Sequence, residues 1–385
     1  MLSPDNITNE FPIEEHLDYL NHAAVAPWPR RSAEAIGRFT EQNLTRGATD
    51  YLEWLKVEKR LRDQLKILIN AESHDEIALL KNTSEALSVI AYGLTWQQGD
   101  NIVSSDQEFP SNRIVWQSLK KSQGVELRKA SLEQSDSPEQ ALFEQCDSKT
   151  RLLTISSVQY ASGIRLNLKK IGEFCRARGI LFCVDAIQSL GAHPFDVQGV
   201  SADFVMADGH KWMLGPEGLA LFYCRREHIN TLKLNQYGWH MVEAVGEYDQ
   251  ESWQPAKSAR RFECGSPNML AIHALDASLS LLLELGMDKV EKLIAERVNQ
   301  IIELIKQRPQ LTLITPSEPQ RRSGIVTFCH QKIDSEHLYQ SLMNVGVICA
   351  ARGGGIRFSP HFYTSKQSIN RAFQRLDQCI QLGKF

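Results

Sequence analysis

The sequence predicts an α/β fold, with a large domain built on a mostly parallel sheet with helices on both faces and a smaller α+β domain. From residue 77 onward, short apolar runs alternate with amphipathic helical stretches, which is typical of βαβ units. The chain has 385 residues, more than a single core usually organises. Near residue 287 an apolar helix gives way to a charged one. We therefore expect a large domain over residues 19–285 and a small domain formed by residues 1–18 and 286–385.

The individual elements follow from hydrophobic periodicity. In the large domain we expect helices at 31–46, 51–70, 86–94, 137–147, 168–178 and 269–285, and strands at 77–80, 101–105, 125–129, 151–157, 179–185, 204–207 and 219–223. In the small domain we expect helices at 287–307, at 335–344 and from 364, with strands at 324–329 and 346–349. Strands that alternate with helices in this way predict parallel pairing in the large domain.

Composition narrows the classes of function. With 42% hydrophobic and 23% charged residues and a net charge of −3, the chain has neither a disordered composition nor the basic excess typical of nucleic-acid binding. No apolar run reaches the ~18 residues that a membrane span needs, and residues 1–11 do not resemble a signal peptide. Eight scattered cysteines without a C-x-x-C pair indicate reduced thiols. We expect a cytoplasmic enzyme that acts on small molecules, without a metal site, nucleic acid or membrane as partner.

A lysine lies in a predicted tight turn between two buried strands. Residues 208–218 read Asp-Gly-His-Lys-Trp-Met-Leu-Gly-Pro-Glu-Gly, so Lys211 stands between a histidine and a tryptophan. Lysine is rarely buried without a function. Burial lowers the pKa of an ammonium group, and the neutral amine forms Schiff bases with carbonyl compounds. Lys211 is therefore the predicted covalent anchor of a carbonyl cofactor.

An acid ends the apolar run just upstream, and a side-chain amide follows three residues later. Asp185 would lie at the carboxyl end of a parallel strand, where open α/β sheets bind ligands. Pyridoxal phosphate (PLP) needs such a carboxylate, because its protonated ring nitrogen makes it an electron sink. We therefore predict that Asp185 pairs with the ring nitrogen and that Gln188 reaches the ring oxygen.

Together these motifs resemble the class V aminotransferase family of PLP-dependent enzymes, which have fold type I and include cysteine desulfurases, isopenicillin-N epimerase and kynureninase. The similarity runs from Tyr19-Leu-Asn-His-Ala-Ala24 to Ile356-Arg-Phe-Ser-Pro-His361. The resemblance implies that Lys211 holds PLP as a Schiff base, the internal aldimine, and then acts as acid and base at the substrate's α-carbon. It also implies that Asp185 and His210 complete the catalytic group, with His210 near the ring or the phosphate.

The phosphate is expected at a helix start. Asn82 and Glu85 fit a capping box, and the free N–H groups and hydroxyls that follow make an anion site. Thr83 and Ser84 would then bind the phosphate, like the family's Thr-Thr-Glu turn. The alternative is an ordinary capped helix.

Three further residues complete the predicted cofactor site. Asp208 precedes the lysine turn, and Phe109 stands where cysteine desulfurases place a histidine stacked on the ring. Ser266, in Gly-Ser-Pro-Asn, resembles the family turn whose hydroxyl reaches the phosphate of the neighbouring subunit. The resemblance therefore implies a homodimer with a shared active site.

The substrate residues are expected near both ends of the chain. Arg357 offers a planar fork suited to a carboxylate, and it aligns with the family's arginine for the substrate α-carboxylate. Arg352 is a candidate for a second substrate group, with a surface arginine as its alternative. Asn21 and His22 lie in the segment that lines the family's pocket, although a capping or core role is equally open for His22. Tyr160 is a pocket residue where desulfurases usually have asparagine.

We expect an aminotransferase-like enzyme acting on an amino acid. In cysteine desulfurases a nucleophilic cysteine precedes the carboxylate arginine, but here that loop is shortened to Arg352-Gly-Gly-Gly355. Cys349 lies in an apolar run, where a thiol is usually inert. Persulfide transfer is therefore disfavoured, whereas a carbon–sulfur lyase without a protein thiol stays open. An epimerase would need a second base, for which Tyr160, His240 and His361 are candidates, and a PLP-fold binding protein is the non-enzymatic alternative.

Overall fold

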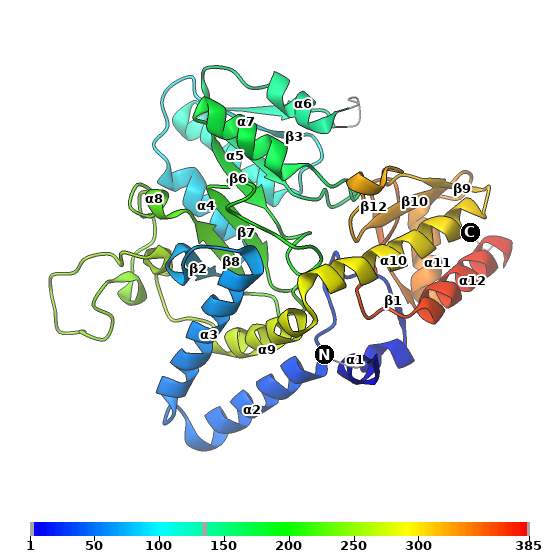
Figure 1. The fold of residues 1–385 in the computed structure, drawn as a ribbon, viewed down its shortest axis with the longest axis horizontal. Helices are drawn as coiled ribbons and strands as arrows, with labels where there is room; N and C mark the ends of the chain where they lie inside the picture. The colour runs from blue at the N-terminus through cyan, green and yellow to red at the C-terminus, as the bar shows by residue number, and fades with distance from the viewer. Residues whose placement is uncertain (1–3, 133–136, 383–385) are drawn as a thin grey trace.

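A seven-stranded sheet forms the centre of the large domain. The computed structural model describes residues 4–132 and 137–382 (Figure 1). The strand order is β2-β8-β7-β6-β5-β3-β4, in which only β8 runs antiparallel to its neighbours. The strands are β2 (Ile77–Leu80), β3 (Asn101–Ser105), β4 (Glu126–Ala130), β5 (Thr150–Ser156), β6 (Leu181–Asp185), β7 (Phe204–Asp208) and β8 (Ala220–Cys224). The predicted mostly parallel α/β architecture is confirmed.

Helices cover both faces of this sheet. The helices of the large domain are α2 (Arg30–Arg46), α3 (Tyr51–Ile69), α4 (Thr83–Gly93), α5 (Ser111–Gln123), α6 (Pro138–Glu144), α7 (Leu168–Arg178), α8 (Arg226–Ile229) and α9 (Met269–Leu285). Helix α2 packs on α9 and lies away from the sheet (Figure 1). In β7, Phe204 and Met206 pack with α4 and α5, whereas Val205 and Ala207 belong to the core that includes α7 and α9. Alternate residues of a strand point to opposite faces, so a strand covered on both faces is apolar throughout.

The small domain is a four-stranded antiparallel sheet with three helices. Its strand order is β12-β13-β10-β9. The elements are α10 (Met287–Lys306), β9 (Leu311–Leu313), β10 (Val326–His330), α11 (Ser335–Asn344), β11 (Val347–Ile348), β12 (Ala350–Arg352), β13 (Gly355–Phe358) and α12 (Lys366–Leu382). The predicted boundary at residue 286 falls at the 85° bend between α9 and α10.

The N-terminal segment runs along the small domain before it enters the large one. It contains α1 (Pro4–Glu10) and β1 (Asp18–Tyr19), and β1 pairs in parallel with β11. The short 3₁₀ helices are η1 (Pro12–Glu15), η2 (His74–Glu76), η3 (Trp239–Met241), η4 (Ala259–Phe262) and η5 (Pro319–Arg321). Residues 20–26 therefore reach the site from the small-domain side.

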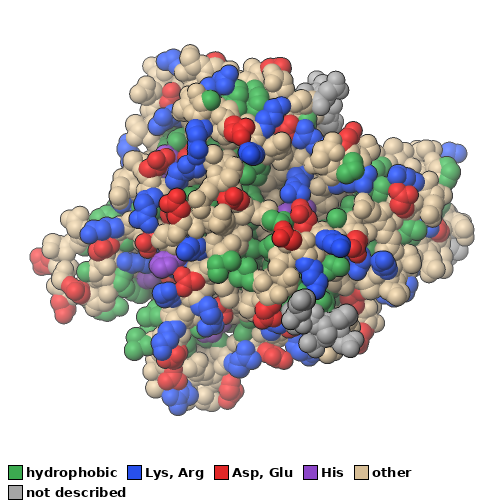
Figure 2. Space-filling model, viewed as in Figure 1, with side chains coloured by type: hydrophobic (Ala, Val, Ile, Leu, Met, Phe, Trp, Pro, Cys, Tyr) green, Lys and Arg blue, Asp and Glu red, His purple; other side chains and the backbone are tan. Residues whose placement is uncertain are grey.

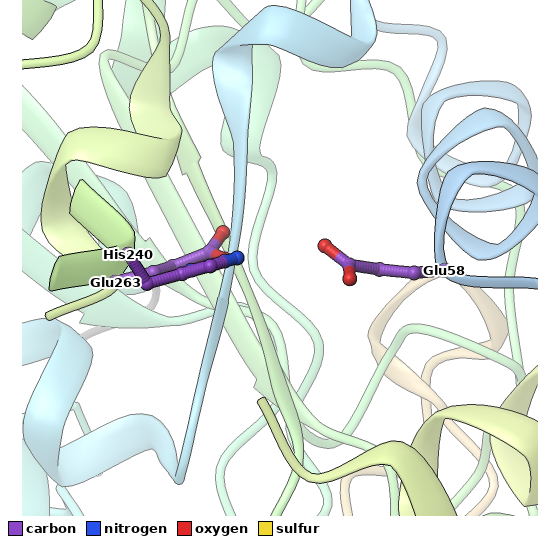
Figure 3. A group of neighbouring side chains, drawn as sticks. All are labelled: Glu58, His240 and Glu263. Atoms are coloured by element: carbon purple, nitrogen blue, oxygen red, sulfur yellow. The ribbon is translucent and has the colours of Figure 1, made fainter. Parts of the chain in front are cut away.

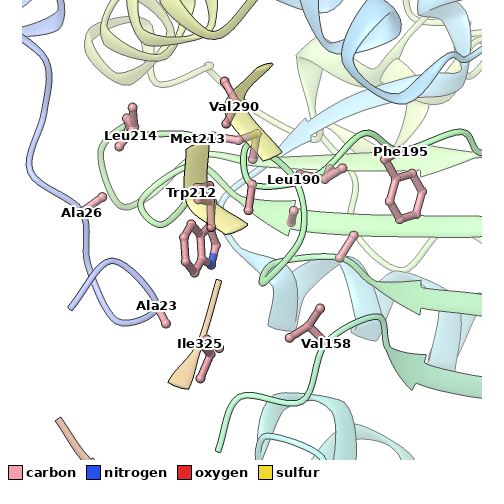
Figure 4. Packing of buried hydrophobic residues seen from close by; sticks show 14 of the residues in the cluster. Ala23, Ala26, Val158, Leu190, Phe195, Trp212, Met213, Leu214, Val290 and Ile325 are labelled. Atoms are coloured by element: carbon pink, nitrogen blue, oxygen red, sulfur yellow. The ribbon is translucent and has the colours of Figure 1, made fainter. Parts of the chain in front are cut away.

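Trp212 joins these parts into one core. Figure 4 shows its indole near Ala23 of the N-terminal segment and Ile325 of the small domain, which belong to the same buried core. A Cβ at Gly324 would lie 2.2 Å from the indole, so glycine alone fits there. The residue after Lys211 is thereby clamped between the domains, which holds the lysine turn in place.

The surface carries charges of both signs. On the face shown in Figure 2, Lys and Arg side chains are interspersed with Asp and Glu. Among the described residues, no single helix is both long and apolar enough to cross a membrane. All eight cysteines are free thiols.

Candidate active site

The site lies where β5, β6 and β7 end and the lysine turn begins. Asp185 is the last residue of β6 and Asp208 the last of β7. The turn closes through hydrogen bonds from Gly209 N–H to the Leu219 carbonyl at 2.9 Å and from Gly215 N–H to the Gly209 carbonyl at 2.8 Å. These contacts bring Lys211 beside the ends of the parallel strands, as the sequence predicted for a ligand site in an α/β sheet.

Lys211 has the electrostatic environment of a reactive amine. Burial lowers its pKa, and the positive charge of Arg357 lowers it further, whereas Asp185 and Asp208 oppose both effects. The Nζ atom lies 5.7 Å from the centre of the Phe109 ring, and Phe109 meets Tyr160 edge to face at 5.2 Å. A lysine of this kind is neutral more often near pH 7 than a surface lysine and is a better nucleophile.

Asp185 ends β6, and Gln188 follows three residues later. Asp185 is buried and accepts the Ile187 N–H at 3.1 Å. Burial raises its pKa, as does nearby Glu108, while Lys211 lowers it. The Gln188 amide donates to the Ala23 carbonyl at 3.0 Å and accepts from the Trp212 indole at 2.8 Å. One amide hydrogen of Gln188 therefore remains for a ligand.

Helix α4 begins beside Asp208, a contact that the sequence did not reveal. Both the N–H and the hydroxyl of Thr83 donate to Asp208 Oδ1, at 2.6 and 3.2 Å. Asn82 caps the helix by accepting the Glu85 N–H at 2.8 Å, and the Ser84 hydroxyl donates to Ser111 at 2.8 Å. The two residues predicted to bind phosphate thus lie at a helix N-terminus that already faces a carboxylate.

His210 and Ser266 occupy different surroundings. His210 Nδ1 lies 3.5 Å from Asp208 Oδ2 but is a buried atom without a hydrogen-bond partner among the described residues. Burial lowers the pKa of His210 to about 4, and neighbouring Lys211 contributes to this decrease, so the ring is neutral at pH 7. Ser266 is exposed on the loop before α9, where a second subunit can reach it.

Arg357 is a buried cation that no carboxylate of residues 4–132 and 137–382 neutralises in an ion pair. It lies on β13 and is 2% exposed. One of its Nη atoms donates to the Tyr160 carbonyl at 2.8 Å, and its Nε atom is buried without a partner. Burial lowers its pKa to about 10, and no carboxylate among the described residues forms an ion pair with it. Because a buried charge is costly unless it is paired, an anionic ligand would stabilise this guanidinium.

The segment before Arg357 is a tight hairpin. Strands β12 and β13 are joined by Gly353 and Gly354, which have φ angles of 58° and 75°. These angles are those of a two-residue turn that favours glycine. Arg352 is exposed at the hairpin end and donates to the Ala351 carbonyl at 2.8 Å. Cys349 is buried, and burial raises the pKa of its thiol to about 12.

Asn21 and His22 differ in what they offer a ligand. The side-chain oxygen of Asn21 is buried without a partner among the described residues. His22 is fully buried, and its ring nitrogens lie 2.8 Å from the Ser359 carbonyl and 2.6 Å from the Tyr363 hydroxyl. Both nitrogens are engaged, so the predicted substrate contact by His22 is not supported, and we interpret it as a link between the N-terminal segment and the small domain.

Glu108 was not among the residues that the sequence singled out, yet it connects the walls of the site. Its buried carboxylate accepts five hydrogen bonds, from Ser105 Oγ at 3.1 Å, Asn112 Nδ2 at 2.7 Å, Ser156 N–H at 2.9 Å, Ser156 Oγ at 2.5 Å and Gln159 Nε2 at 2.7 Å. It ties the ends of β3 and β5 to α5 and to the residue before Tyr160. An acid beside an aromatic in a loop carries no sequence signal for such a role.

Another charged group lies apart from these residues, between α3 and the η3–η4 region. Figure 3 shows Glu58 pointing toward His240 and Glu263, which could suggest a metal site. Arg62, however, donates to Glu58 at 2.6 Å and to both oxygens of Glu263 at 2.7 and 2.8 Å. The Arg62 guanidinium therefore occupies the position that a metal ion would need. His240 Nδ1 lies 3.6 Å from Glu263 Oε2.

The residues around Lys211 fit a bound anionic cofactor and an amino-acid substrate. Buried polar atoms without a partner among the described residues are rare in folded proteins. Three of those found here belong to predicted ligand contacts, namely His210 Nδ1, Asn21 Oδ1 and Arg357 Nε. A lysine with a lowered pKa, a carboxylate for a ring nitrogen and a guanidinium without a carboxylate partner among the described residues together match the groups that PLP and an α-amino acid present.

Comparison with known proteins agrees with this geometry. The family model described as "Aminotransferase class-V" matches residues 18–371. A probable cysteine desulfurase of Methanothermobacter thermautotrophicus is 28% identical over 98% of this chain and 98% of its own length. A cysteine desulfurase of Pectobacterium carotovorum is 30% identical over 90% of this chain and 84% of its own.

Solved structures have the same fold. The apo cysteine desulfurase of Thermococcus onnurineus has a TM-score of 0.88 at 21% identity and covers 99% of both chains. The cystine C-S lyase C-DES, in complex with its product cysteine persulfide, has a TM-score of 0.88 at 23% identity, over 95% of this chain and 98% of its own. A mutant of C-DES carries glycine covalently linked to its PLP cofactor, with a TM-score of 0.89 at 22% identity over 96% and 98% of the two chains. With a family model that spans nearly the whole sequence and a fold shared with these structures, the chain belongs to the class V aminotransferase family of PLP-dependent enzymes.

Proposed function

We propose that this protein is a PLP-dependent carbon–sulfur lyase that acts on a sulfur-containing α-amino acid without a nucleophilic cysteine of its own. The observation that carries the proposal is the glycine hairpin before Arg357. Where desulfurases have a cysteine loop, this chain has the two-residue turn at Gly353 and Gly354. The names of the relatives given above refer to the removal of sulfur or the cleavage of a carbon–sulfur bond, which favours elimination over the transamination that the sequence alone predicts.

The proposed roles follow from the contacts. Bound PLP supplies an electron sink for the electron pair that remains when the α-proton is removed. Lys211 Nζ would take that proton, since its lowered pKa leaves it neutral in a larger fraction of molecules. Arg357 would bind the α-carboxylate by two hydrogen bonds, and Asp185 would hold the proton on the ring nitrogen. Loss of the sulfur group from the β-carbon and hydrolysis then yield pyruvate and ammonia.

Transamination is the second candidate, and the match to the aminotransferase family model favours it. It would use the same lysine, carboxylate and arginine. Epimerisation would need a second base, and two candidates have their rings turned to other partners. His361 Nε2 contacts the Trp212 carbonyl at 3.0 Å and its Nδ1 accepts the Phe362 N–H at 2.9 Å, whereas His240 lies beside Glu263.

A panel of L- and D-amino acids that includes cysteine and cystine would test the reaction. We expect pyruvate and a sulfur product from an L-amino acid. An amino-acid-dependent conversion of the cofactor to its amine form, without pyruvate, would replace the lyase by an aminotransferase. Arg357→Ala should raise KM by about a hundredfold, since a buried bidentate partner is lost, whereas Arg38→Ala, which removes an exposed arginine of α2, is the control. An equal rise for both variants would mean that the carboxylate site is misplaced.

We also propose that the protein is a homodimer. An arm formed by residues 235–258 projects from the large domain, at the left of Figure 1. Its aromatic side chains are exposed, with Tyr237 at 65%, Tyr248 at 75% and Trp253 at 49%, and a second subunit would cover them. Ser266 follows the arm and would then face the partner's cofactor phosphate. Light scattering at micromolar concentration should give twice the 43.6 kDa chain mass.

A further inference from the structure

The N-terminus of α4, where the cofactor phosphate is expected, is already in contact with a carboxylate. Thr83 donates its N–H and its hydroxyl to Asp208 Oδ1. The Glu85 N–H is used by Asn82. Of the first three N–H groups of the helix, that of Ser84 alone has no acceptor among the described residues. A phosphate bound there would therefore lie beside Asp208.

The groups that face Asp208 do not neutralise it completely. The positive charge of Lys211 lowers the pKa of Asp208, whereas the negative charge of Glu217 raises it. Asp208 in turn raises the pKa of nearby Asp185. His210 lies 3.5 Å away but is neutral near pH 7. Once Lys211 is bound to a carbonyl, its charge depends on the state of that bond. A phosphate dianion would therefore meet an ionised carboxylate in a largely enclosed site.

Two anions that share an enclosed site bind a proton between them. Asp208 can accept this proton near neutral pH, because burial raises its pKa to about 6. Its hydrogen bonds from Thr83 and the charge of Lys211 limit the increase. A protonated carboxyl group keeps one oxygen as an acceptor for Thr83 and gains an O–H donor on the other. That donor is what a phosphate oxygen requires.

We propose that Asp208 takes up one proton from solvent when the phosphate of the cofactor binds, and that the resulting O–H donates to a phosphate oxygen. Oδ1 continues to accept from Thr83, and the only bond formed in the protein is the O–H bond of Asp208. The proposal concerns the binding of PLP and holds for lyase and aminotransferase alike. Its consequence is that the affinity for the phosphate group decreases as the pH rises.

The size of the effect follows from proton linkage. Above pH 7 Asp208 is mostly ionised in the free protein, and a phosphate monoester is mostly a dianion, because its second pKa is about 6. Binding that consumes one proton weakens about tenfold for each unit of pH. The dissociation constant should therefore rise about tenfold between pH 7 and pH 8.

Pyridoxine 5′-phosphate is the probe of choice, because it has no aldehyde and so cannot react with Lys211. We would titrate it into the cofactor-free wild type, Asp208→Asn and Glu85→Gln at both pH values, and repeat each titration with pyridoxine, which lacks the phosphate. The side-chain amide introduced by Asp208→Asn would accept from Thr83 and donate to phosphate without a proton. This variant should bind at least tenfold more tightly than the wild type at pH 8, with the tenfold pH dependence lost.

The control variant removes a charge from the same helix end. Glu85 accepts the Lys81 N–H at 2.7 Å and pairs with the Lys81 ammonium, away from Thr83. Glu85→Gln should keep the tenfold pH dependence. Pyridoxine should show the same pH dependence with wild type and Asp208→Asn, since it lacks the phosphate that Asp208 senses.

Calorimetry in two buffers of different ionisation enthalpy measures the number of protons that the protein takes up when the ligand binds. We expect about one proton bound by the wild type at pH 8, after subtraction of the pyridoxine value. Uptake of no proton, or equal pH dependence in wild type and Asp208→Asn, would overturn the proposal. The calorimetric result decides the question even if the variant does not fold. Failure of either lyase or aminotransferase assays would leave this outcome unaffected.

Discussion

Two groups of enclosed charges differ in whether protein side chains pair with them. One lies within the large domain, and the other joins large-domain residues to Arg357 on β13 of the small domain. In the closed cluster, formed by Glu58, Arg62 and Glu263, every carboxylate oxygen that faces the arginine is bonded, and Glu263 also accepts the Leu79 N–H at 2.8 Å. Its residues come from α3 and from the loop before α9. Both carboxylates are paired with the arginine, so we interpret the cluster as a contribution to the fold.

The open cluster, formed by Asp185, Asp208, Lys211 and Arg357, is unfinished. Arg357 has an unpartnered Nε, and the lysine pKa is lowered by burial instead of being raised by a close ion pair. Burial raises the pKa of both aspartates. Such charges destabilise the free protein until a ligand pairs with them. The comparison teaches that incomplete pairing, and not burial alone, distinguishes the site from the core.

Breaking the closed cluster should have the largest effect on stability. Arg62→Met leaves Glu58 and Glu263 as buried carboxylates without their cation, which should lower the free energy of unfolding by about 3–5 kcal/mol in urea denaturation. The control is Arg308→Met, whose bidentate partner Asp377 is partly exposed, and whose loss should cost less than about 1 kcal/mol. Equal losses for both variants would contradict the distinction.

Breaking the open cluster should abolish activity and leave stability intact. Lys211→Ala removes the covalent anchor and the base, so kcat should decrease at least about 10³-fold, as measured by product formation at saturating substrate. The absorption band of the protein-bound Schiff base should disappear. Because the lysine's charge is destabilised by burial, the cofactor-free variant should unfold at no lower urea concentration than the wild type. If Lys211→Ala is strongly destabilised, the lysine contributes to the stability of the fold, like the residues of the closed cluster, and the prediction is wrong.

The pH dependence of stability sharpens the same comparison. The folded pKa of Asp208 is about 6, above its ordinary value of 3.8, so the folded state holds the proton more tightly than the unfolded chain. Ionisation therefore costs stability between about pH 4 and 6, and the cost stays constant above that range. Cofactor-free Asp208→Asn should gain stability relative to the wild type across this window, by at most about 3 kcal/mol. A stability difference that does not change between pH 4 and pH 7 would contradict the assignment.

The open cluster was largely predictable because its members carry local signals. Asp185 ends one apolar run and Lys211 lies in the turn after another, so the order of strands and turns predicted that these two residues lie close together. Arg357 follows three glycines, and the resemblance to the family assigned it to the same site. The parallel sheet was predictable for the same reason, and the helix at 168–178 has the predicted bounds. Repetition of strand and helix leaves few topologies open.

The remaining features depend on contacts between distant residues. The contact from Thr83 to Asp208 joins positions 125 residues apart, and β1 pairs with β11 although each strand has two residues. The structure also pairs β12 with β13, where the sequence suggested a short loop. Hydrogen bonds from a carboxylate to several polar side chains leave no periodic pattern. The closed cluster and Glu108 were therefore invisible to sequence reasoning.

Glu108 shares features of both clusters. Among the substitutions considered, its replacement should change activity and stability the least. Its hydrogen bonds are complete, like those of the closed cluster, yet they hold the loops that carry Phe109 and Tyr160. In Glu108→Gln, the side-chain NH2 group would face groups that are themselves donors, such as Asn112 Nδ2. We therefore expect the loops that carry Phe109 and Tyr160 to shift. Because the Tyr160 carbonyl holds Arg357, we expect KM to rise about tenfold with a smaller change in kcat.

A matched variant separates this positioning role from a loss of stability. Glu139 is also a buried carboxylate, and it accepts from the Arg321 guanidinium and from the Asn167 N–H at 2.7 Å. Glu139→Gln should lower the urea midpoint about as much as Glu108→Gln while KM stays within about twofold of the wild type. If KM rises equally in both variants, Glu108 acts only through general stability. If KM rises in Glu108→Gln alone, a carboxylate with complete hydrogen bonds still serves the site, because it fixes the residues that hold the unpaired arginine.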